Sequence, residues 1–269
     1  MAYDHRVRRI GMALLLTVLI ACGAATALYL LRHSGPEGQL RIEWAPAISL
    51  GPGVGVREGK LPSAPDWRVV DLALDPSKVE LRVAASARGA PLEQLVKGGV
   101  LAAVNGGYFD QNFQPTGWLR DHGVELAPRQ QRVQGGVLAL TRGKLFIGRS
   151  SELPFAAEFI LQNSPRLVEA GGAVGIRSDD GRRASRTFAC DVAGRLHLVV
   201  IAGGLSGGPT LLEAAQLSAA EPAQGGLGCQ AALNLDGGPS TGLWLPASSG
   251  IAPVLTHAPI AYAVTVLPR

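Results

Sequence analysis

The sequence predicts an α+β fold, built mostly from antiparallel sheets with a few helices and preceded by one apolar N-terminal helix. Glycine and proline supply 35 and 18 of the 269 residues, and such abundant turn formers favour many short strands over long helices. Hairpin patterns also outnumber segments with helical spacing, which is typical of antiparallel sheets. A doubly wound fold would need strands alternating with helices throughout, and that order is missing. The hydrophobic content of 47% is ample for one sizeable core.

The N-terminal region predicts export. Residues 1–9 carry Arg6, Arg8 and Arg9, and residues 10–31 are an uncharged apolar stretch. At about 1.5 Å per residue, this stretch is long enough to cross a hydrocarbon core of roughly 30 Å. By the positive-inside rule, residues 1–9 stay in the cytoplasm as the n-region and the rest of the chain lies outside. We therefore expect a signal anchor that holds the protein in the cell membrane, with the domain on the extracytoplasmic side.

Two other interpretations of this region also imply export. Ala25-Thr26-Ala27 suits the cleavage site of a secretory signal peptide, which would give a secreted protein. Cys22, within Leu19-Ile20-Ala21-Cys22-Gly23, suits a bacterial lipoprotein. The apolar run continues past Cys22 to Leu31, and this favours the uncleaved anchor. The net charge of +4 is not arranged in basic runs interleaved with aromatic residues, so we expect no nucleic-acid partner.

Residues 32–45 read as a linker and residues 46–269 as one domain, because no second break in composition follows. Hairpins are predicted where two strand-like segments flank a short turn, namely Trp67–Leu74 with Val79–Ala84, Gly135–Leu140 with Lys144–Gly148, and Thr187–Val192 with Arg195–Ala202. Helices are predicted for Pro91–Lys97 and Pro209–Ala219, buried strands for Val100–Val104 and Ala231–Leu235, and a last strand for Ile260–Leu267.

One sequence motif, a polar residue followed by two glycines, occurs twice in the chain. Asn105-Gly106-Gly107 and Asp236-Gly237-Gly238 each follow a buried strand, which itself follows a helical segment. Glycines let the backbone turn sharply and approach a ligand closely. The repetition therefore predicts that two strands of one core present Asn105 and Asp236 to a single site.

Asp236 is the main candidate for catalysis, because a carboxylate at the end of an apolar strand is partly desolvated and more basic. Ser240 and Thr241, with the N–H groups of Gly237 and Gly238, are expected to form an anion-binding nest behind it. Near Asn105, the ring of Tyr108 is suited to stacking on a sugar.

Two arginines and a glutamine complete the predicted site. Arg166 and Gln162 belong to a polar segment that follows Phe159-Ile160-Leu161, and Arg186 precedes a strand; both guanidinium groups are candidates for binding an anion. The five histidines fit no zinc spacing, and we expect neither a metal nor a cofactor. Cys190 and Cys229 are either a disulfide or two buried thiols.

A rival motif is Gly204-Leu205-Ser206-Gly207-Gly208, which fits G-x-S-x-G between a strand and a helix. Asp236 and His257 follow Ser206 in the order of the α/β-hydrolases. That fold needs parallel βα units before the motif, where this sequence predicts hairpins, and it leaves Asn105 unexplained.

Taken in order, several motifs resemble those of the phosphodiester glycosidase family. They are Val104-Asn105-Gly106-Gly107-Tyr108-Phe109, Pro115-Thr116-Gly117-Trp118, Gln162-Asn163-Ser164-Pro165-Arg166-Leu167-Val168, Arg186-Thr187, Ser206-Gly207-Gly208-Pro209-Thr210-Leu211-Leu212-Glu213 and Ala232-Leu233-Asn234-Leu235-Asp236-Gly237-Gly238-Pro239-Ser240-Thr241. The family's eukaryotic member removes N-acetylglucosamine from phosphodiester-linked mannose. Pro239 departs from the family pattern, which often has glycine there, and it removes one N–H donor from the loop.

The resemblance implies an enzyme that hydrolyses a sugar-1-phosphodiester of envelope or extracellular glycans. Asp236 would act as the nucleophile or as the base for water, Arg186 with Arg166 would neutralise the phosphate, and Asn105 would orient the sugar or the phosphate. Asp110 and Glu169 are the candidates for a second carboxylate. The alternatives are a non-catalytic glycan- or phosphate-binding module on the same scaffold, and the serine hydrolase with Ser206, Asp236 and His257.

Overall fold

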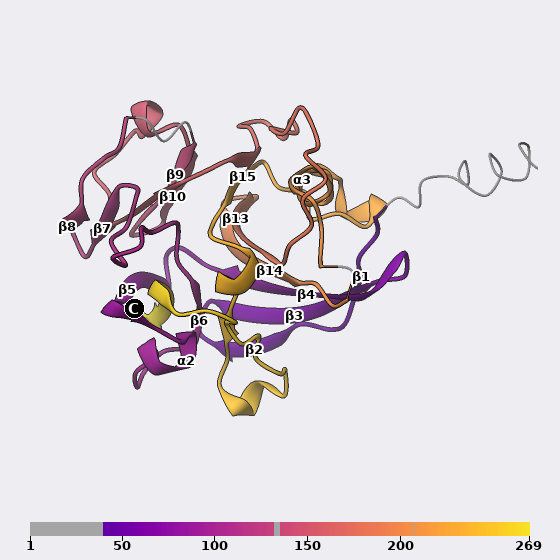
Figure 1. The fold of residues 1–269 in the computed structure, drawn as a ribbon, viewed down its shortest axis with the longest axis horizontal. Coiled ribbons are helices and arrows are strands. Elements are labelled where there is room, and N and C mark those ends of the chain that lie inside the picture. Colours follow the sequence, from indigo (N-terminus) through magenta and orange to yellow (C-terminus); the bar gives the residue numbers. More distant parts are fainter. Residues whose placement is uncertain (1–39, 132–134, 206) are drawn as a thin grey trace, which may run out of the picture. The chain divides into compact units, whose positions relative to one another are not determined.

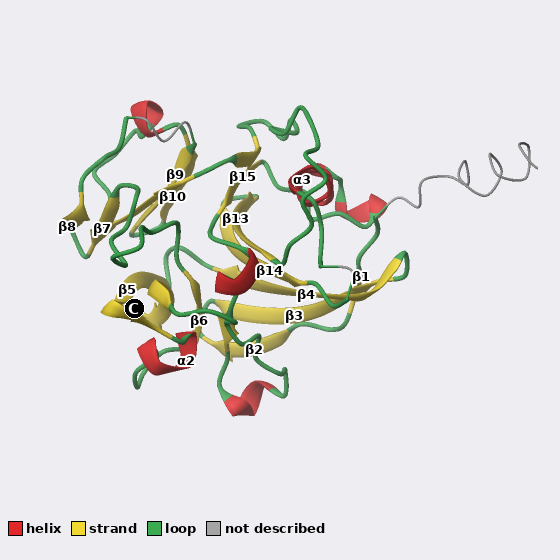
Figure 2. Ribbon diagram, in the orientation of Figure 1, coloured by secondary structure: helices red, strands yellow, loops and turns green. Residues whose placement is uncertain are grey.

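Antiparallel sheets dominate the structure, a computed structural model that describes residues 40–131, 135–205 and 207–269 (Figure 2). Every strand pair within these residues is antiparallel, and the helices there are few and short. The predicted mostly antiparallel architecture is therefore confirmed. The predicted apolar helix, residues 10–31, lies outside the described residues. No helix in the described part of the chain is long and apolar enough to cross a membrane.

The largest sheet has eight strands in the order β1-β3-β4-β14-β13-β15-β12, with β2 paired to β3. Its strands are β1 (Glu43–Trp44), β2 (Ile48–Gly51), β3 (Val54–Leu61), β4 (Ala64–Leu74), β12 (Arg166–Val168), β13 (Arg186–Val192), β14 (Arg195–Ala202) and β15 (Ala231–Asn234). A five-stranded sheet, ordered β10-β9-β11-β7-β8, contains β7 (Leu119–Asp121), β8 (Val124–Ala127), β9 (Gly136–Thr141), β10 (Lys144–Gly148) and β11 (Phe159–Asn163). A four-stranded sheet, ordered β16-β6-β17-β5, contains β5 (Val79–Ala90), β6 (Ala102–Asn105), β16 (Leu243–Trp244) and β17 (Ile260–Pro268).

The helical elements are short and connect strands along the chain; α2 and α3 are labelled in Figure 1. They are α2 (Leu92–Leu95), α3 (Leu211–Ala219) and the 3-10 turns η1 (Ser150–Glu152), η2 (Pro222–Gln224), η3 (Gly238–Ser240) and η4 (Ala247–Ser249). Helix α3 confirms the helix predicted after Pro209, and a capping box between Thr210 and Glu213 fixes its first turn. Helix α2 is shorter than predicted, because Val96 is already extended and two glycines follow it.

Two of the predicted hairpins form, β9 with β10 and β13 with β14, and the last strand is β17. The hairpin predicted around residues 75–78 was wrong. The turn is present, with the Lys78 N–H donating to the Asp75 carbonyl at 2.9 Å. Both edges of β4 are already bonded to β3 and β14, so β5 leaves the turn for another sheet and pairs with β17.

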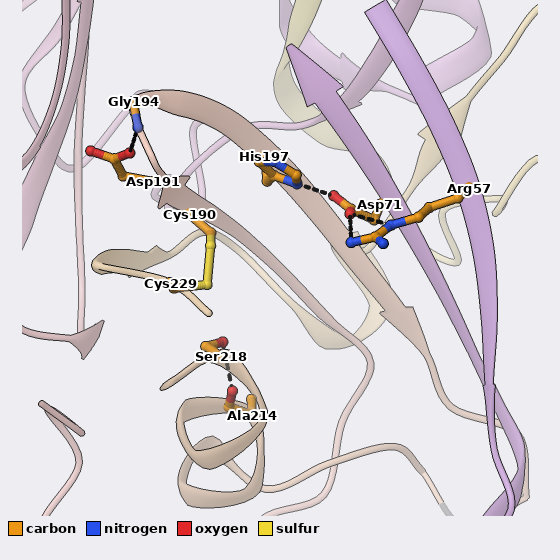
Figure 3. The surroundings of a disulfide bond; sticks show 9 residues. All are labelled: Arg57, Asp71, Cys190, Asp191, Gly194, His197, Ala214, Ser218 and Cys229. Atoms are coloured by element: carbon orange, nitrogen blue, oxygen red, sulfur yellow. Dashed lines mark hydrogen bonds and ion pairs between the residues drawn. A yellow bond between two sulfur atoms is a disulfide. The ribbon is translucent and has the colours of Figure 1, made fainter. Parts of the chain in front are cut away.

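The eight-stranded sheet is buried on both faces, as the alternation along β14 shows. Leu196, Leu198 and Val200 enter a core that also contains side chains of the other two sheets. Val199 and Ile201 point the opposite way, into a second core that includes α3. In that second core Cys190 of β13 forms a disulfide with Cys229, which precedes β15; their Cα atoms are 5.6 Å apart (Figure 3).

Candidate active site

The two repeated glycine motifs meet, although their strands belong to different sheets. Asn105 ends β6 of the four-stranded sheet, and Asp236 follows β15 of the eight-stranded sheet. The Asn105 Nδ2 group donates to the Asp236 carbonyl at 2.8 Å, and the Asp236 N–H donates to the Gly106 carbonyl at 3.1 Å. The motifs therefore form one junction between two sheets.

Asp236 is the carboxylate at this junction. Its side chain is half-buried, and its Oδ1 atom accepts the Gly237 N–H at 2.9 Å. Burial raises the pKa of Asp236 above its ordinary value of 3.8, while hydrogen bonds from Ser240 and Gly237 partly oppose that rise. A carboxylate of raised basicity, still reachable from solvent, is suited to act as a base or a nucleophile.

Asn105 is fully buried, and both the nitrogen and the oxygen of its side-chain amide are hydrogen-bonded. Besides Asp236, its Nδ2 group donates to the Gly106 carbonyl at 3.1 Å. Its Oδ1 atom accepts the Thr187 hydroxyl at 2.6 Å and the Gly242 N–H at 3.1 Å. The amide thus holds protein segments in place, which makes Asn105 a positioning residue for the Asp236 loop.

Gly106 and Gly107 make room for a protein side chain. A Cβ atom on Gly106 would lie 2.2 Å from the ring of Tyr262, and one on Gly107 would lie 2.9 Å from the Tyr262 hydroxyl. That hydroxyl accepts the Gly107 N–H at 2.9 Å, and burial strongly raises the pKa of Tyr262, with the Asp236 charge adding to the rise. Sequence reasoning missed Tyr262, which has no local signal because it lies inside an ordinary apolar strand.

Tyr108 lies within electrostatic range of both Asp236 and Arg186. Tyr108 is 37% exposed as a whole, while its hydroxyl accepts a hydrogen bond from the Asn234 Nδ2 group at 3.1 Å. Burial raises the pKa of Tyr108, the Asp236 charge raises it further, and the Arg186 charge lowers it. The phenol is therefore close enough to both charges for each of them to shift its pKa.

Arg186 begins β13 and lies against the Asp236 loop, since a Cβ atom on Gly237 would be 3.9 Å from its Cδ. Its guanidinium donates to the carbonyls of Pro209 at 3.1 Å and Arg182 at 2.7 Å. No carboxylate of the described residues lies within ion-pair distance of it. Burial lowers the pKa of Arg186 below its ordinary value, so a partly desolvated cation borders the loop that carries Asp236.

The loop behind Asp236 does not form the predicted anion nest. The N–H groups of Gly237 and Gly238 donate to Asp236 Oδ1 and to the Ser185 carbonyl. Those of Ser240 and Thr241 donate to the carbonyls of Gly237 and Gly238 and close η3. Because all four donors are used within the protein, the loop contributes Asp236 rather than an anion site. Ser240 and Thr241 are both buried.

Gln162 and Arg166 are bonded to other parts of the protein. The Gln162 Oε1 atom accepts the N–H groups of Trp118 and Gln130 at 2.9 and 3.0 Å. Arg166 forms a bidentate ion pair with Glu169, with both N···O distances 2.8 Å, and also donates to the Gly135 carbonyl. Because Arg166 is already paired, Arg186 is the better placed cation for binding a phosphate. The same ion pair occupies Glu169, and its hydrogen bonds from Arg166 lower the pKa of Glu169.

Asp110, the other candidate for a second carboxylate, is exposed. Its Oδ1 atom accepts the N–H groups of Asn112 and Gln114 at 2.8 and 2.9 Å, which is a turn arrangement.

Two buried asparagines were not predicted as site residues. Asn163 accepts the Tyr108 N–H at 3.0 Å and donates to the Asn234 carbonyl at 2.8 Å. Asn234 holds the Tyr108 hydroxyl, and its own Oδ1 atom is buried without a partner in the described part of the chain. Both lie in motifs quoted above, so an amide inside an otherwise apolar strand was the available signal.

The serine-hydrolase motif lacks its structural context. Ser206 lies outside the described residues. Asp236 and His257 are described, but the strands around them pair antiparallel, whereas the α/β-hydrolase motif needs a parallel sheet. Residues 40–131, 135–205 and 207–269 contain no group of three or more His, Cys, Asp or Glu side chains arranged to hold a metal ion.

A family model described as phosphodiester glycosidase matches residues 98–267, a range that includes Asn105, Arg186 and Asp236. No curated protein sequence matches the chain significantly.

Two solved structures show the same fold at 17% sequence identity. A hypothetical protein from Synechocystis has a TM-score of 0.65, with 87% of this chain and 69% of that chain covered. The catalytic domain of zebrafish N-acetylglucosamine-1-phosphodiester α-N-acetylglucosaminidase, described as auto-inhibited by its pro-peptide, has a TM-score of 0.60, with 87% and 85% covered.

Proposed function

The chain belongs to the phosphodiester glycosidase family, and we propose that it hydrolyses the bond between the anomeric carbon of a sugar and the oxygen of a phosphodiester. The observation that carries the proposal is that one loop brings the two groups near each other: Asp236, with its raised pKa, precedes Gly237, and the partly desolvated Arg186 lies against Gly237. A carboxylate and a guanidinium whose charges both act on the Tyr108 phenol suit a substrate with a sugar carbon next to a phosphate.

In the proposed reaction, the C1–O bond breaks and its electron pair leaves with the phosphate monoester. On one route Asp236 attacks C1 and forms a glycosyl ester, which water then hydrolyses to release the sugar and restore the carboxylate; on the other, Asp236 takes a proton from the water that attacks C1. The leaving group is stable as an anion, so the enzyme needs less general-acid help than an ordinary glycosidase. Arg186 stabilises the negative charge that develops on this leaving group, because an already desolvated cation interacts strongly with it.

Other side chains position these two. Asn105 fixes the backbone of Asp236 through the bond to its carbonyl, and Asn234 fixes the Tyr108 hydroxyl. The exposed part of the Tyr108 ring offers the sugar an apolar surface.

We place this activity outside the cytoplasm, on envelope or extracellular glycans, with the protein anchored through residues 10–31. The support is the charge pattern of residues 1–31, together with the disulfide between Cys190 and Cys229, because disulfides persist mainly in oxidising compartments.

The test is Asp236→Asn in the full chain, assayed by release of free sugar from UDP-N-acetylglucosamine and from synthetic glycosyl phosphodiesters. Hydrolysis should fall by at least about a hundredfold while the fold survives, because the amide keeps the shape but cannot act as a base. Asp110→Asn is the matched control, since that carboxylate serves an exposed turn, and it should retain activity. Equal activity of Asp236→Asn and the native chain would remove Asp236 from the chemistry, and binding without sugar release would favour a non-catalytic module.

A further inference from the structure

The hydroxyl hydrogen of Tyr108 has no acceptor in the described part of the chain. The hydroxyl oxygen accepts a hydrogen bond from the Asn234 Nδ2 group at 3.1 Å. The same nitrogen also donates to two carbonyls, of Ser164 at 3.2 Å and of Leu235 at 2.6 Å. Because carbonyl oxygens only accept hydrogen bonds, they fix the amide with its nitrogen toward Tyr108. An amide nitrogen cannot accept in return, so the phenol hydrogen points elsewhere.

Strand register places this hydroxyl near the two charged groups of the candidate active site. Asn234, which holds the hydroxyl, pairs with Phe188 of β13. The same antiparallel register, continued by two residues, sets Asp236 opposite Arg186. Two residues along a strand span about 7 Å, so one bound substrate can reach the phenol and both charges. The charges of Asp236 and Arg186 both shift the pKa of Tyr108, in agreement with this placement.

Tyr108 is also the phenol that a substrate can reach. Tyr108 is exposed, whereas Tyr262, whose pKa the Asp236 charge also raises, is buried. Within residues 40–131, 135–205 and 207–269, no hydrogen bond joins the Tyr108 hydroxyl to Asp236, whose Oδ1 atom accepts the Gly237 N–H instead. A buried donor without an acceptor costs free energy, so we expect the phenol hydrogen to face solvent or a bound ligand.

We propose, on the basis of the function proposed above, that the Tyr108 hydroxyl is a catalytic group that donates a hydrogen bond to the phosphate of the substrate. A phosphodiester carries one negative charge. When the C1–O bond breaks, its electron pair stays on the former bridging oxygen, and the phosphate monoester gains a second negative charge. A hydrogen bond to this group is therefore stronger in the transition state than in the bound substrate, which accelerates the reaction.

Tyr108 donates this hydrogen bond and keeps its proton. Burial and the Asp236 charge raise the pKa of Tyr108 above that of an ordinary phenol, which is about 10, and the Arg186 charge partly opposes the rise. A phosphate monoester binds a proton with a pKa of only about 6. Transfer of the phenol proton to the leaving group is therefore unfavourable, and the neutral hydroxyl supplements the charge of Arg186 without replacing it.

The test is Tyr108→Phe in the full chain, which removes one oxygen atom and keeps the ring. Asn234 retains the carbonyls of Ser164 and Leu235 as acceptors, so the fold should survive and the urea midpoint should stay close to the native value. The kcat for a glycosyl phosphodiester should fall by about ten- to a hundredfold, the effect of losing a hydrogen bond to a charged group. The KM should stay within about threefold, because the bond acts mainly in the transition state.

A series of leaving groups distinguishes a catalytic role from a structural one. The substrates share N-acetylglucosamine as the sugar, joined at C1 to methyl phosphate or to para-nitrophenyl phosphate, and release of free sugar is measured for each. The para-nitrophenyl group withdraws electrons and stabilises the departing anion by itself. The loss caused by Tyr108→Phe should therefore be largest for methyl phosphate and several-fold smaller for para-nitrophenyl phosphate, whereas a purely structural defect would lower both rates equally.

Thr265→Val is the matched control, since it removes a hydroxyl that donates to the Arg82 carbonyl at 3.1 Å, and it should keep the native kcat. A native kcat in Tyr108→Phe, or an equal loss with both leaving groups, would overturn the role of Tyr108. If that result came with an inactive Asp236→Asn, the proposed function would stand and only the role of Tyr108 would fail. A native chain that releases no sugar from either substrate would remove both proposals.

Discussion

Replacing Asn105 by alanine tests whether this residue supports the active site by holding protein segments together. The side chain makes four hydrogen bonds, to the backbone of Gly106, Asp236 and Gly242 and to the Thr187 hydroxyl, at 2.6 to 3.1 Å. It is fully buried, so water does not readily replace these bonds. At about 1 kcal/mol for each bond, Asn105→Ala should lower the free energy of unfolding by about 4 kcal/mol.

Equilibrium unfolding in urea measures this change. With a denaturant slope of roughly 2 to 3 kcal/mol per molar, a loss of about 4 kcal/mol moves the midpoint down by about 1.3 to 2 M. Thr187→Val is the matched control: it removes one of the four bonds while keeping shape and burial, and should cost about 1 kcal/mol. If Asn105→Ala cost no more than Thr187→Val, the amide would not hold the loops together, and its assignment as a positioning residue would fail.

Three further predictions concern the carboxylate, the glycines and the disulfide. Because burial raises the pKa of Asp236 and the ionised form is the active one, kcat/KM should rise with pH along an acid limb centred above 3.8; a limb at or below that value would contradict the assignment. Gly106→Ala drives a methyl group into the Tyr262 ring and should cost about 1 to 3 kcal/mol in urea unfolding, against less than about 0.5 for Gly98→Ala, which meets open space; equal costs would refute the packing argument. The disulfide closes a loop over a sequence separation of 39, so replacing Cys190 and Cys229 by alanine should lower the free energy of unfolding by about 4 kcal/mol, and an unchanged thermal midpoint would show that the bridge adds no stability.

The sequence predicted the fold best where the signal was local. Turn residues between two alternating segments identified the β9–β10 and β13–β14 hairpins, and Thr210 with Glu213 begins α3 close to where the spacing placed it. The turn after Leu74 was equally clear, yet the two strands that it joins lie in different sheets. A turn determines a change of direction, but strand pairing depends on which edges are free, and both edges of β4 are occupied by strands from elsewhere in the chain.

In the candidate site, too, local sequence identified the residues but not the long-range contacts that they make. The repeated glycine motifs singled out Asn105 and Asp236, and the structure joins the two by hydrogen bonds. The sequence did not show that the Asn105 amide faces the protein, because its partners Thr187 and Gly242 lie about 80 and 140 positions away. Arg166 and Arg186 looked alike as loop cations, and only the ion pair with Glu169 distinguishes the first from the second.

By itself, the sequence determined the antiparallel fold, the residues of the two glycine motifs and the family to which the chain belongs, because these depend on local chemistry and on the order of motifs. Tertiary structure alone decided which polar groups remain available to a ligand. Each hydrogen-bonding group is satisfied by whichever partner the folded chain brings to it, and for Asn105, Gln162 and Arg166 that partner is the protein itself.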